Sequence, residues 1–514
     1  MKSKYDKHTT FNGVVVLTVA LIIVKILSAI YRVPYQNILG DEGLYAYQQI
    51  YPIVALGVIL TMHAIPSAVT QTFGSQAQSS QYTKVLLRLQ LISTLFFFVV
   101  FVCANWIALL MGDTNLTPML RAASFSFLFI GILGVYRGYY QAHQRMSIPA
   151  ISQVIEQVIR VGIIIIATVL FMTRDWTVYT AGTIAILGSA VGFLASSTFL
   201  MQRRPFQLQV KQQSANTIIE WRKLSLAIVI FAISQLIVIV WQVIDSFTVI
   251  HALRSAGLNF QEAATQKGIF DRGASFIQMG LIVTTTFCFV LIPMLTDALK
   301  SHQNILVDRY ANASIKITMM FSVAAGIGLI NLLPIMNSVF FKNDSLTGTL
   351  AIYMLTVICV SLIMMDIALL QVKNQVGPVL FAFAVGVISK VMLNVILIPQ
   401  LLMLGGSLST VMSLIVFSLV LHYHVLKYYK FQRMRKYVFK LTITMVMLSI
   451  AVQLSMWVMP TEGRLTGLLE LVISAMIGVL VIVFAIIRMH LLSYRELKHL
   501  PLGDKLYQMK RGRH

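Results

Sequence analysis

The sequence is poor in charge, in acidic residues above all, and in cysteine. Charged residues make up 11% of the 514, and hydrophobic residues 58%, whereas an ordinary soluble domain is about 25% charged. This composition excludes a soluble globular fold and predicts a chain that crosses a membrane many times. The 3 cysteines, Cys103, Cys288 and Cys359, lie in apolar runs without metal-binding or redox spacing. We therefore expect small core residues there, and no metal site.

Two kinds of functional segment are also missing. The chain has no glycine-rich ATP-binding loop, so energy would come from the membrane potential or an ion gradient. The longest expected outer loop, 251–267, carries Glu262 as its only carboxylate. A membrane glycosyltransferase or polymerase would need paired acids in such a loop. We therefore expect no enzyme activity and no cofactor.

Long apolar runs fill the remainder of the chain. A membrane-spanning helix needs roughly 20 apolar residues, and fourteen segments of this kind can be counted. They lie at about 10–31, 45–72, 84–111, 118–141, 150–172, 177–201, 223–250, 268–296, 310–341, 347–371, 377–400, 405–426, 437–459 and 465–489. Because they leave no room for a sizeable soluble domain, the sequence predicts an all-α polytopic membrane protein.

The formal net charge of +22 follows the expected topology. With the N-terminus inside, the inner segments hold 28 Lys and Arg residues and the outer segments 7. This bias places both termini in the cytoplasm under the positive-inside rule. The basic excess is explained by topology and attraction to anionic lipid. We therefore expect a cell-membrane protein that binds no nucleic acid.

The stretch Gly138–Arg160 places charge inside an apolar segment. Pro149 opens a helix, and Arg160 then lies about 16 Å into the membrane. Glu156 is four residues earlier, on the same face. Two interpretations stay open, a pair that neutralises itself and a functional site, the default for an intramembrane charge. Arg137, close to the cytoplasmic end of the preceding helix, is expected to snorkel.

Other ionisable or polar residues stand in apolar segments as well. Arg32 would either snorkel to the outer interface or contact an anion at the outer end of a cavity. The further candidates are Lys25 in the first helix, Asp245 in the seventh, Asp271 and Arg272 in the eighth, and Lys390 and Asn394 in the eleventh. An anionic substrate suits this set, because clustered Arg and Lys favour phosphate.

The two halves of the chain repeat each other. Pro66, Gln141, Pro149 and Arg160 have counterparts 227 to 230 residues later, in Pro293, Gln371, Pro378 and Lys390. Six helices per copy imply a parallel repeat, with two six-helix lobes around a central cavity. We expect an N-lobe at 1–201, a basic linker at 202–222, a C-lobe at 223–426, and two extra helices with a basic tail at 427–514. Each lobe then has one cation in mid-membrane.

These motifs resemble the multidrug/oligosaccharidyl-lipid/polysaccharide exporter superfamily. The similarity is to its lipid II flippase group and the Gram-positive relatives of the stage V sporulation protein B type. It rests on Tyr31-Arg-Val-Pro, on Gly138–Arg160, on Asp271-Arg272 and on the run from Pro378 to Asn394. The resemblance implies a flippase that carries undecaprenyl-diphosphate-linked sugar, such as the peptidoglycan precursor lipid II, to the outer leaflet. It also implies that Arg32 and Arg272 contact the diphosphate, and it suggests cell-wall synthesis enzymes as partners.

The alternative substrates are another lipid-linked polysaccharide unit, or a drug or cation that exchanges for an ion. Some family members bind sodium between helices seven, eleven and twelve. Asp245 resembles the helix-seven ligand, whereas Lys390 stands near the helix-eleven ligands. Our hypothesis is that the Lys390 ammonium replaces the ion and pairs with Asp245, so that transport needs no sodium.

Overall fold

The computed structural model describes residues 23–24, 27, 31–74, 77–203, 206, 219–459, 463–493 and 496. All regular elements among these residues are helical, and twelve helices or helix runs are long and apolar enough to span a membrane. The expected first segment, 10–31, lies almost entirely outside the described residues. The all-α polytopic membrane fold is confirmed. Contacts divide the chain into two compact units, residues up to Asp271 (unit 1) and from Arg272 onward (unit 2).

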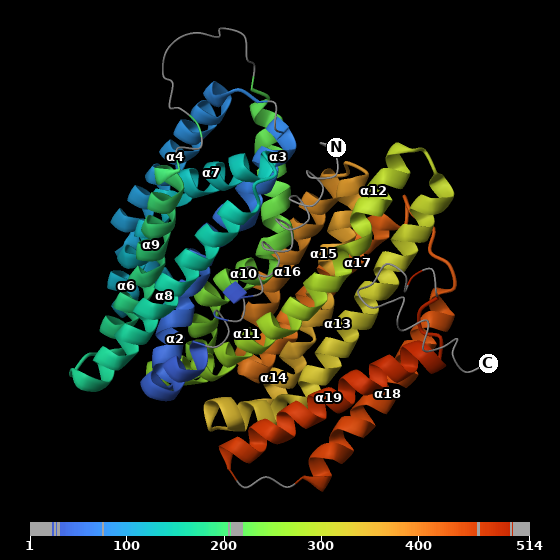
Figure 1. Ribbon diagram of the computed structural model, residues 1–514. Coiled ribbons are helices and arrows are strands. Elements are labelled where there is room, and N and C mark those ends of the chain that lie inside the picture. The colour runs from blue at the N-terminus through green and yellow to red at the C-terminus, as the bar shows by residue number, and fades with distance from the viewer. Residues whose placement is uncertain are drawn as a thin grey trace. The chain divides into compact units, whose positions relative to one another are not determined.

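Unit 1 is built from nine described α-helices and the first part of a tenth, α11 (Figure 1). They are α2 (Arg32–Ile59), α3 (Ile65–Phe73), α4 (Ser79–Val102), α5 (Ala104–Leu110), α6 (Thr117–Ser124), α7 (Ile130–Ala142), α8 (Ser147–Thr173), α9 (Val178–Gln202), α10 (Trp221–Ser255) and α11 (Phe260–Cys288). Helices α8 and α9 run side by side, and α10 packs on α2 and α3. The compact unit thus extends beyond the lobe boundary expected at residue 223.

Unit 2 contains the rest of α11 and the helices that follow (Figure 1). They are α12 (Ile292–Lys300), α13 (Asn304–Phe341), α14 (Thr347–Met354), α15 (Thr356–Val372), α16 (Gly377–Leu401), α17 (Met403–Val425), α18 (Met434–Val458) and α19 (Arg464–Arg488). Helices α16 and α17 pack together as α8 and α9 do in unit 1. The two extra C-terminal helices, α18 and α19, pack on each other and on α13.

The start of α2 differs from the expected connection between residues 31 and 45. It is helical from Arg32, with a break at Gly40, whose φ of 74° favours glycine. The helix passes through a π-helical turn, Leu60–Ala64, before α3. Pro66 stands in the first turn of α3, where its missing N–H costs nothing. Together these segments form a 42-residue helix run.

The repeat predicted from the sequence is visible in the backbone. In unit 1 the turn between α7 and α8 has Gln144 at φ 58°, and the Arg145 N–H donates to the Tyr140 carbonyl at 2.8 Å. In unit 2 the turn between α15 and α16 has Asn374 at φ 55°, and the Gln375 N–H donates to the Leu370 carbonyl at 2.9 Å. These left-handed residues are 230 apart. The two turns are therefore equivalent.

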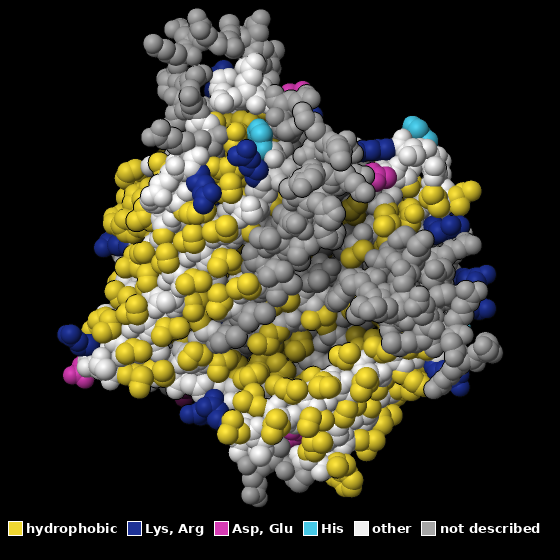
Figure 2. All heavy atoms as spheres, in the orientation of Figure 1, with side chains coloured by type: hydrophobic (Ala, Val, Ile, Leu, Met, Phe, Trp, Pro, Cys, Tyr) yellow, Lys and Arg dark blue, Asp and Glu magenta, His cyan; other side chains and the backbone are white. Residues whose placement is uncertain are grey.

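Large apolar side chains cover the outside of both units. On α4, Leu91 is 72% exposed, and on α18, Trp457 is 81% exposed. Figure 2 shows hydrophobic side chains over much of the described surface, with few charged ones among them. An exposed apolar surface of this extent suits lipid rather than water.

Candidate functional site

Four tyrosines of unit 1 pack together around the Gly40 break. The hydroxyls of Tyr31 and Tyr47 lie 3.0 Å apart and share a hydrogen bond. The ring of Tyr47 lies 5.1 Å from that of Tyr35 and stacks on Tyr51 at 5.7 Å, between ring centroids. All four side chains are buried. The break folds the first turns of α2 against the rest of the helix, which brings these rings together.

Arg32 lies within this aromatic group. Its Cζ is 5.9 Å from the ring centroid of Tyr31 and 5.1 Å from that of Tyr51, and the residue is 1% exposed. Attraction to the ring faces offsets part of the cost of burying the charge. The Nε and Nη1 atoms have no hydrogen-bond partner within the described part of the chain. Arg32 is therefore buried in protein rather than snorkelling, with donors available to an anion.

Arg160 reaches the same aromatic group from α8. It is 2% exposed and donates from Nη2 to the Gln157 side chain. As at Arg32, its Nε and Nη1 lack a partner among the described residues. Both guanidiniums lie within electrostatic range of Tyr31, Tyr47 and Tyr51. We call these three tyrosines, the two arginines and Gln157 the tyrosine–arginine cluster.

The cluster brings together two predicted substrate-binding residues, Arg32 and Arg160. The third candidate of unit 1, Lys25, lies outside the described residues. A buried guanidinium with unused N–H groups is a strong donor to phosphate oxygens, because it is planar, always charged and able to bind two oxygens at once. Two such guanidiniums beside the same three tyrosines suit a diphosphate.

Of the two interpretations left open for Glu156 and Arg160, a closed local ion pair is not what the described residues form. Glu156 forms its ion pair with Arg137 of α7, at 2.8 Å between Oε2 and Nη2, and both side chains are 0% exposed. The expected snorkelling of Arg137 is wrong for the same reason. Position near a helix end suggested access to water, but α3, α8 and α9 pack around α7. Arg160 is within electrostatic range of Glu156, but among the described residues it has no carboxylate partner at hydrogen-bond distance.

Arg137 also ties together three helices around the π-helical turn. Its Nε donates to the Ser152 hydroxyl at 3.0 Å, Nη2 to the Ser196 hydroxyl at 3.0 Å, and Nη1 to the Thr61 carbonyl at 3.3 Å. A π-turn leaves carbonyls that lack their usual helical donor, and such turns are frequent at functional sites. We define Arg137 and Glu156 with their hydrogen-bond partners as the unit 1 hub.

The predicted carboxylates Asp245 and Asp271 are both buried in unit 1, at 3% and 8% exposure. Asp271 forms an ion pair with Lys267, at 2.5 Å, and lies within electrostatic range of Asp245 and Arg32. Lys267 is itself buried, although the sequence suggested an outer loop. Next to Asp245, Ser246 accepts from and donates to Gln49 of α2, at 2.9 and 3.1 Å.

In unit 2 the predicted cation of α16 is buried and fully hydrogen-bonded. The Lys390 ammonium donates to Asn394 Oδ1 at 3.0 Å, Ser409 Oγ at 3.3 Å and Thr410 Oγ1 at 2.7 Å. Lys390 and Asn394 are both 0% exposed. An ammonium has three N–H donors, which match three oxygens here. The pairing of Lys390 with Asp245, which lies in unit 1, stays a prediction.

Arg272 opens unit 2. It is 1% exposed, and its Cζ is 5.3 Å from the ring centroid of Phe341. The neighbouring Gly273 leaves no room for a Cβ, which would lie 2.7 Å from the Tyr353 ring. The Phe341 ring therefore packs against Arg272 as the rings of Tyr31 and Tyr51 do against Arg32, and the role of Arg272 at the diphosphate stays a prediction.

Comparison with known proteins identifies the family. Residues 11–299, more than half of the chain, match the family described as polysaccharide biosynthesis protein. The chain belongs to this family. In Bacillus subtilis (strain 168) it is similar to the uncharacterized membrane protein YabM, with 29% identity over 99% of this chain and 98% of YabM. It is also similar to the lipid II flippase MurJ of that organism, with 23% identity over 91% of this chain and 93% of MurJ.

The fold of this polysaccharide biosynthesis protein is that of MurJ. A solved structure of the lipid II flippase MurJ in an inward closed conformation matches with a TM-score of 0.70 at 15% identity. The match covers 94% of this chain and 100% of that chain. The family resemblance derived from the sequence motifs is thereby confirmed.

The sequence motifs did not reveal two parts of the site in this family member. The position of Arg137 near a helix end predicts that it reaches water, but position along a helix does not show which helices pack around it. The motif that begins at Tyr31 predicts no role for the tyrosines. Their spacing offered a signal, since Tyr31 with Tyr35, and Tyr47 with Tyr51, are four residues apart and share helix faces.

Proposed function

We propose that the chain is a flippase that moves an undecaprenyl-diphosphate-linked cell-wall precursor from the inner to the outer leaflet by alternating access. Lipid II is the proposed precursor. The observation that carries this proposal is the tyrosine–arginine cluster, in which two buried guanidiniums have N–H groups without a partner in the described part of the chain. Leaving such donors unsatisfied in a protein interior is costly, so a diphosphate that accepts from them would recover that free energy.

The sign of the cluster favours an anion over a cationic drug. A cation or drug antiporter would place carboxylates where Arg32 and Arg160 stand. Glu156, the nearest carboxylate along α8, is engaged by Arg137 at 2.8 Å. The family description and the similarity to MurJ support a lipid-linked substrate. The proposal keeps both termini in the cytoplasm, and cell-wall synthesis enzymes as the partners that use the flipped product.

The test is complementation of a cell depleted of its lipid II flippase, with lipid II assayed at the outer leaflet. We expect the wild-type chain to restore outer-leaflet lipid II. No restoration, together with export of another polymer, would assign the other candidate substrate, a different lipid-linked polysaccharide unit. We expect Arg272→Ala to abolish restoration while the protein still inserts in the membrane, whereas Arg254→Ala, at an exposed position of α10, restores fully. Wild-type activity of the Arg272→Ala protein would remove Arg272 from the site.

A further inference from the structure

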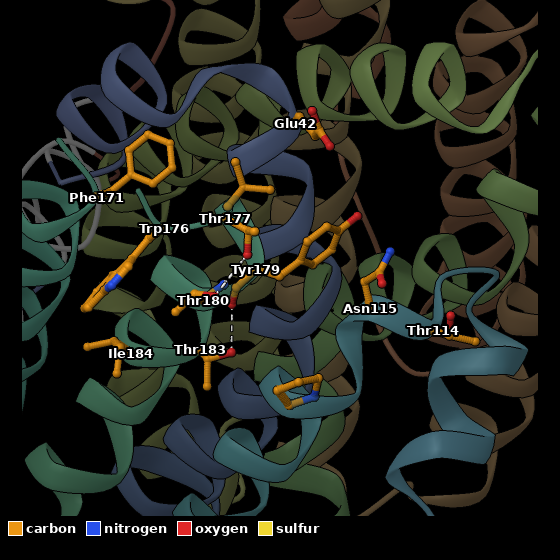
Figure 3. Close-up of a pocket in the computed structure, with 12 residues that line it drawn as sticks. Glu42, Thr114, Asn115, Phe171, Trp176, Thr177, Tyr179, Thr180, Thr183 and Ile184 are labelled. Atoms are coloured by element: carbon orange, nitrogen blue, oxygen red, sulfur yellow. Dashed lines mark hydrogen bonds between the residues drawn. The ribbon is translucent and has the colours of Figure 1, made fainter. Parts of the chain in front are cut away.

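Unit 1 contains a hollow that the tyrosine–arginine cluster does not use. Its volume is about 940 Å³, and it lies where α8 ends and α9 begins. Figure 3 shows Phe171 and Trp176 on one side, Asn115 on the opposite side, Tyr179 between them, and Glu42 at one edge. Under the topology expected from the charge bias, this is the outer end of the unit. Small-molecule sites have volumes of about 300–1,000 Å³, so the hollow accommodates a ligand of several rings.

The wall beside Tyr179 is fixed by a buried carboxylate. Asp113 is 4% exposed and accepts from the Tyr179 hydroxyl at 2.8 Å, the Tyr45 hydroxyl at 3.3 Å and the Asn115 N–H at 3.0 Å. Burial raises the pKa of the Asp113 carboxyl, and these three hydrogen bonds oppose the rise. Tyr179 and Asn115 are therefore held in place before any ligand arrives, which lowers the cost of binding.

The opposite wall combines aromatic faces with hydroxyls. Thr177 caps α9 by accepting from the Thr180 N–H at 3.2 Å. The Thr183 hydroxyl donates to the Tyr179 carbonyl at 2.7 Å. Hydroxyl oxygens that are used in this way still have lone pairs for a ligand. Trp176, in the loop between α8 and α9, contributes a half-buried indole.

The charge of the residues that line the hollow indicates which class of ligand it binds. Among the described lining residues, Glu42 is the single carboxylate and none is Lys or Arg. Glu42 also has no ion-pair partner among the described residues. A phosphate would be repelled here. A sugar presents C–H faces that pack on aromatic rings, and hydroxyls that bond to amide, hydroxyl and carboxylate groups.

We propose that this hollow binds a saccharide, the neutral sugar part of a lipid-linked substrate, separately from the diphosphate. The proposal deepens the flippase function and rests on it for the origin of the sugar. Trp176 and Phe171 provide the stacking faces, and Asn115 and Glu42 bond the hydroxyl or amide groups. Binding at the end of unit 1 would hold the sugar on the side to which the substrate is delivered.

The experiment is calorimetric titration of the purified full-length protein with N,N′-diacetylchitobiose, a soluble disaccharide without lipid or phosphate. We expect saturable binding, and Trp176→Ala should weaken it at least about tenfold. Tenfold corresponds to about 1.4 kcal/mol, which is the contribution of one aromatic contact. Trp176→Phe should keep most of the affinity. The control is Trp106→Ala, which removes a 68% exposed indole of the same unit outside the hollow. Thermal unfolding of each variant shows that it is folded.

The outcomes separate this site from the proposed function. Equal affinity of the Trp176→Ala and wild-type proteins, or no saturable binding at all, overturns the saccharide site, whether or not lipid II is flipped. Competition of inorganic diphosphate with the disaccharide also overturns it. Disaccharide binding that survives Arg160→Ala supports the separate site. A chain that binds the disaccharide but restores no lipid II refutes only the proposed function.

Discussion

Helices α8 and α9 of unit 1 and helices α16 and α17 of unit 2 are two copies of one arrangement with different chemistry. Each pair follows an equivalent turn, and each carries a buried cation on its first helix, Arg160 or Lys390. In unit 2 the ammonium donates to three side-chain oxygens at 2.7 to 3.3 Å. In unit 1 the guanidinium donates to Gln157, while Nε and Nη1 have no partner within the described residues.

This difference shows what the repeat determines and what it leaves open. The backbone repeat sets the position of the cation along the helix. The neighbouring side chains decide whether its donors are already used. A satisfied ammonium stabilises the packing of two helices, whereas unused guanidinium donors are available to a ligand. We therefore propose substrate contact for Arg160 and an internal role for Lys390, although the sequence made them equivalent candidates.

The buried charge pairs of the two units differ in a similar way. Arg137 on α7 pairs with Glu156 on the next helix. In unit 2, Asp366 on α15 pairs with His422 on α17, at 3.1 Å. The partner of this acid therefore lies two helices further along the chain. The pair in the unit 1 hub is buried on both sides, whereas the His422 side chain of the unit 2 pair is 37% exposed.

The largest expected difference in transport is between variants of Arg160 and variants of Lys390. Arg160→Ala should lower outer-leaflet delivery of lipid II about a hundredfold, because it removes charge-assisted hydrogen bonds to the diphosphate worth about 3 kcal/mol. Arg160→Lys should recover part of that loss. Lys390→Ala should cost about tenfold or less, through looser packing of α16 on α17. The comparison breaks if both alanine variants lose the same activity at equal membrane levels.

Breaking the unit 1 hub should give the largest loss of stability. Arg137→Met leaves the Glu156 carboxylate buried without its partner, which costs about 3–5 kcal/mol. Adding Glu156→Gln to this variant should recover most of the loss. His422→Gln should cost less, because the His422 side chain is 37% exposed, and partly exposed ion pairs contribute little to stability. Denaturant unfolding of the purified proteins measures all three, and equal losses for Arg137→Met and His422→Gln would contradict the assignment.

The fold was largely predictable from the sequence, and the site only in part. Apolar runs fixed the helical class, and ionisable residues within them pointed to Arg32 and Arg160. The Gly40 break and the π-helical turn could not be predicted, because each depends on packing of distant segments. Arg137 was missed since its acceptors come from three separate helices. The spacing of Glu156 and Arg160 suggested a local pair, but a helix on another side supplied the better partner.

A smaller loss of stability is expected where α8 and α9 approach each other closely. A Cβ at Gly192 of α9 would lie 2.6 Å from the Glu156 carbonyl, so Gly192→Ala must push α9 away from α8. We expect a loss of about 1–3 kcal/mol in unfolding free energy. The matched control is Gly162→Ala on α8, where a Cβ meets nothing within 4 Å. That variant should be unchanged or up to about 1 kcal/mol more stable through helix propensity. A loss at Gly162 equal to that at Gly192 would contradict close packing as the cause.

The smallest expected effect is on ion dependence, and it tests the role given to Lys390. Sodium binds to oxygen ligands such as those of Asn394, Ser409 and Thr410, but the Lys390 ammonium already donates to all three. Replacing sodium with choline should therefore change wild-type transport by no more than about twofold, since no binding step is lost. In Lys390→Ala the same oxygens become available, and the residual transport should respond to sodium. Strict sodium dependence of the wild-type chain would show that the ammonium does not replace the ion, and Lys390 would then have to move between states of the transport cycle.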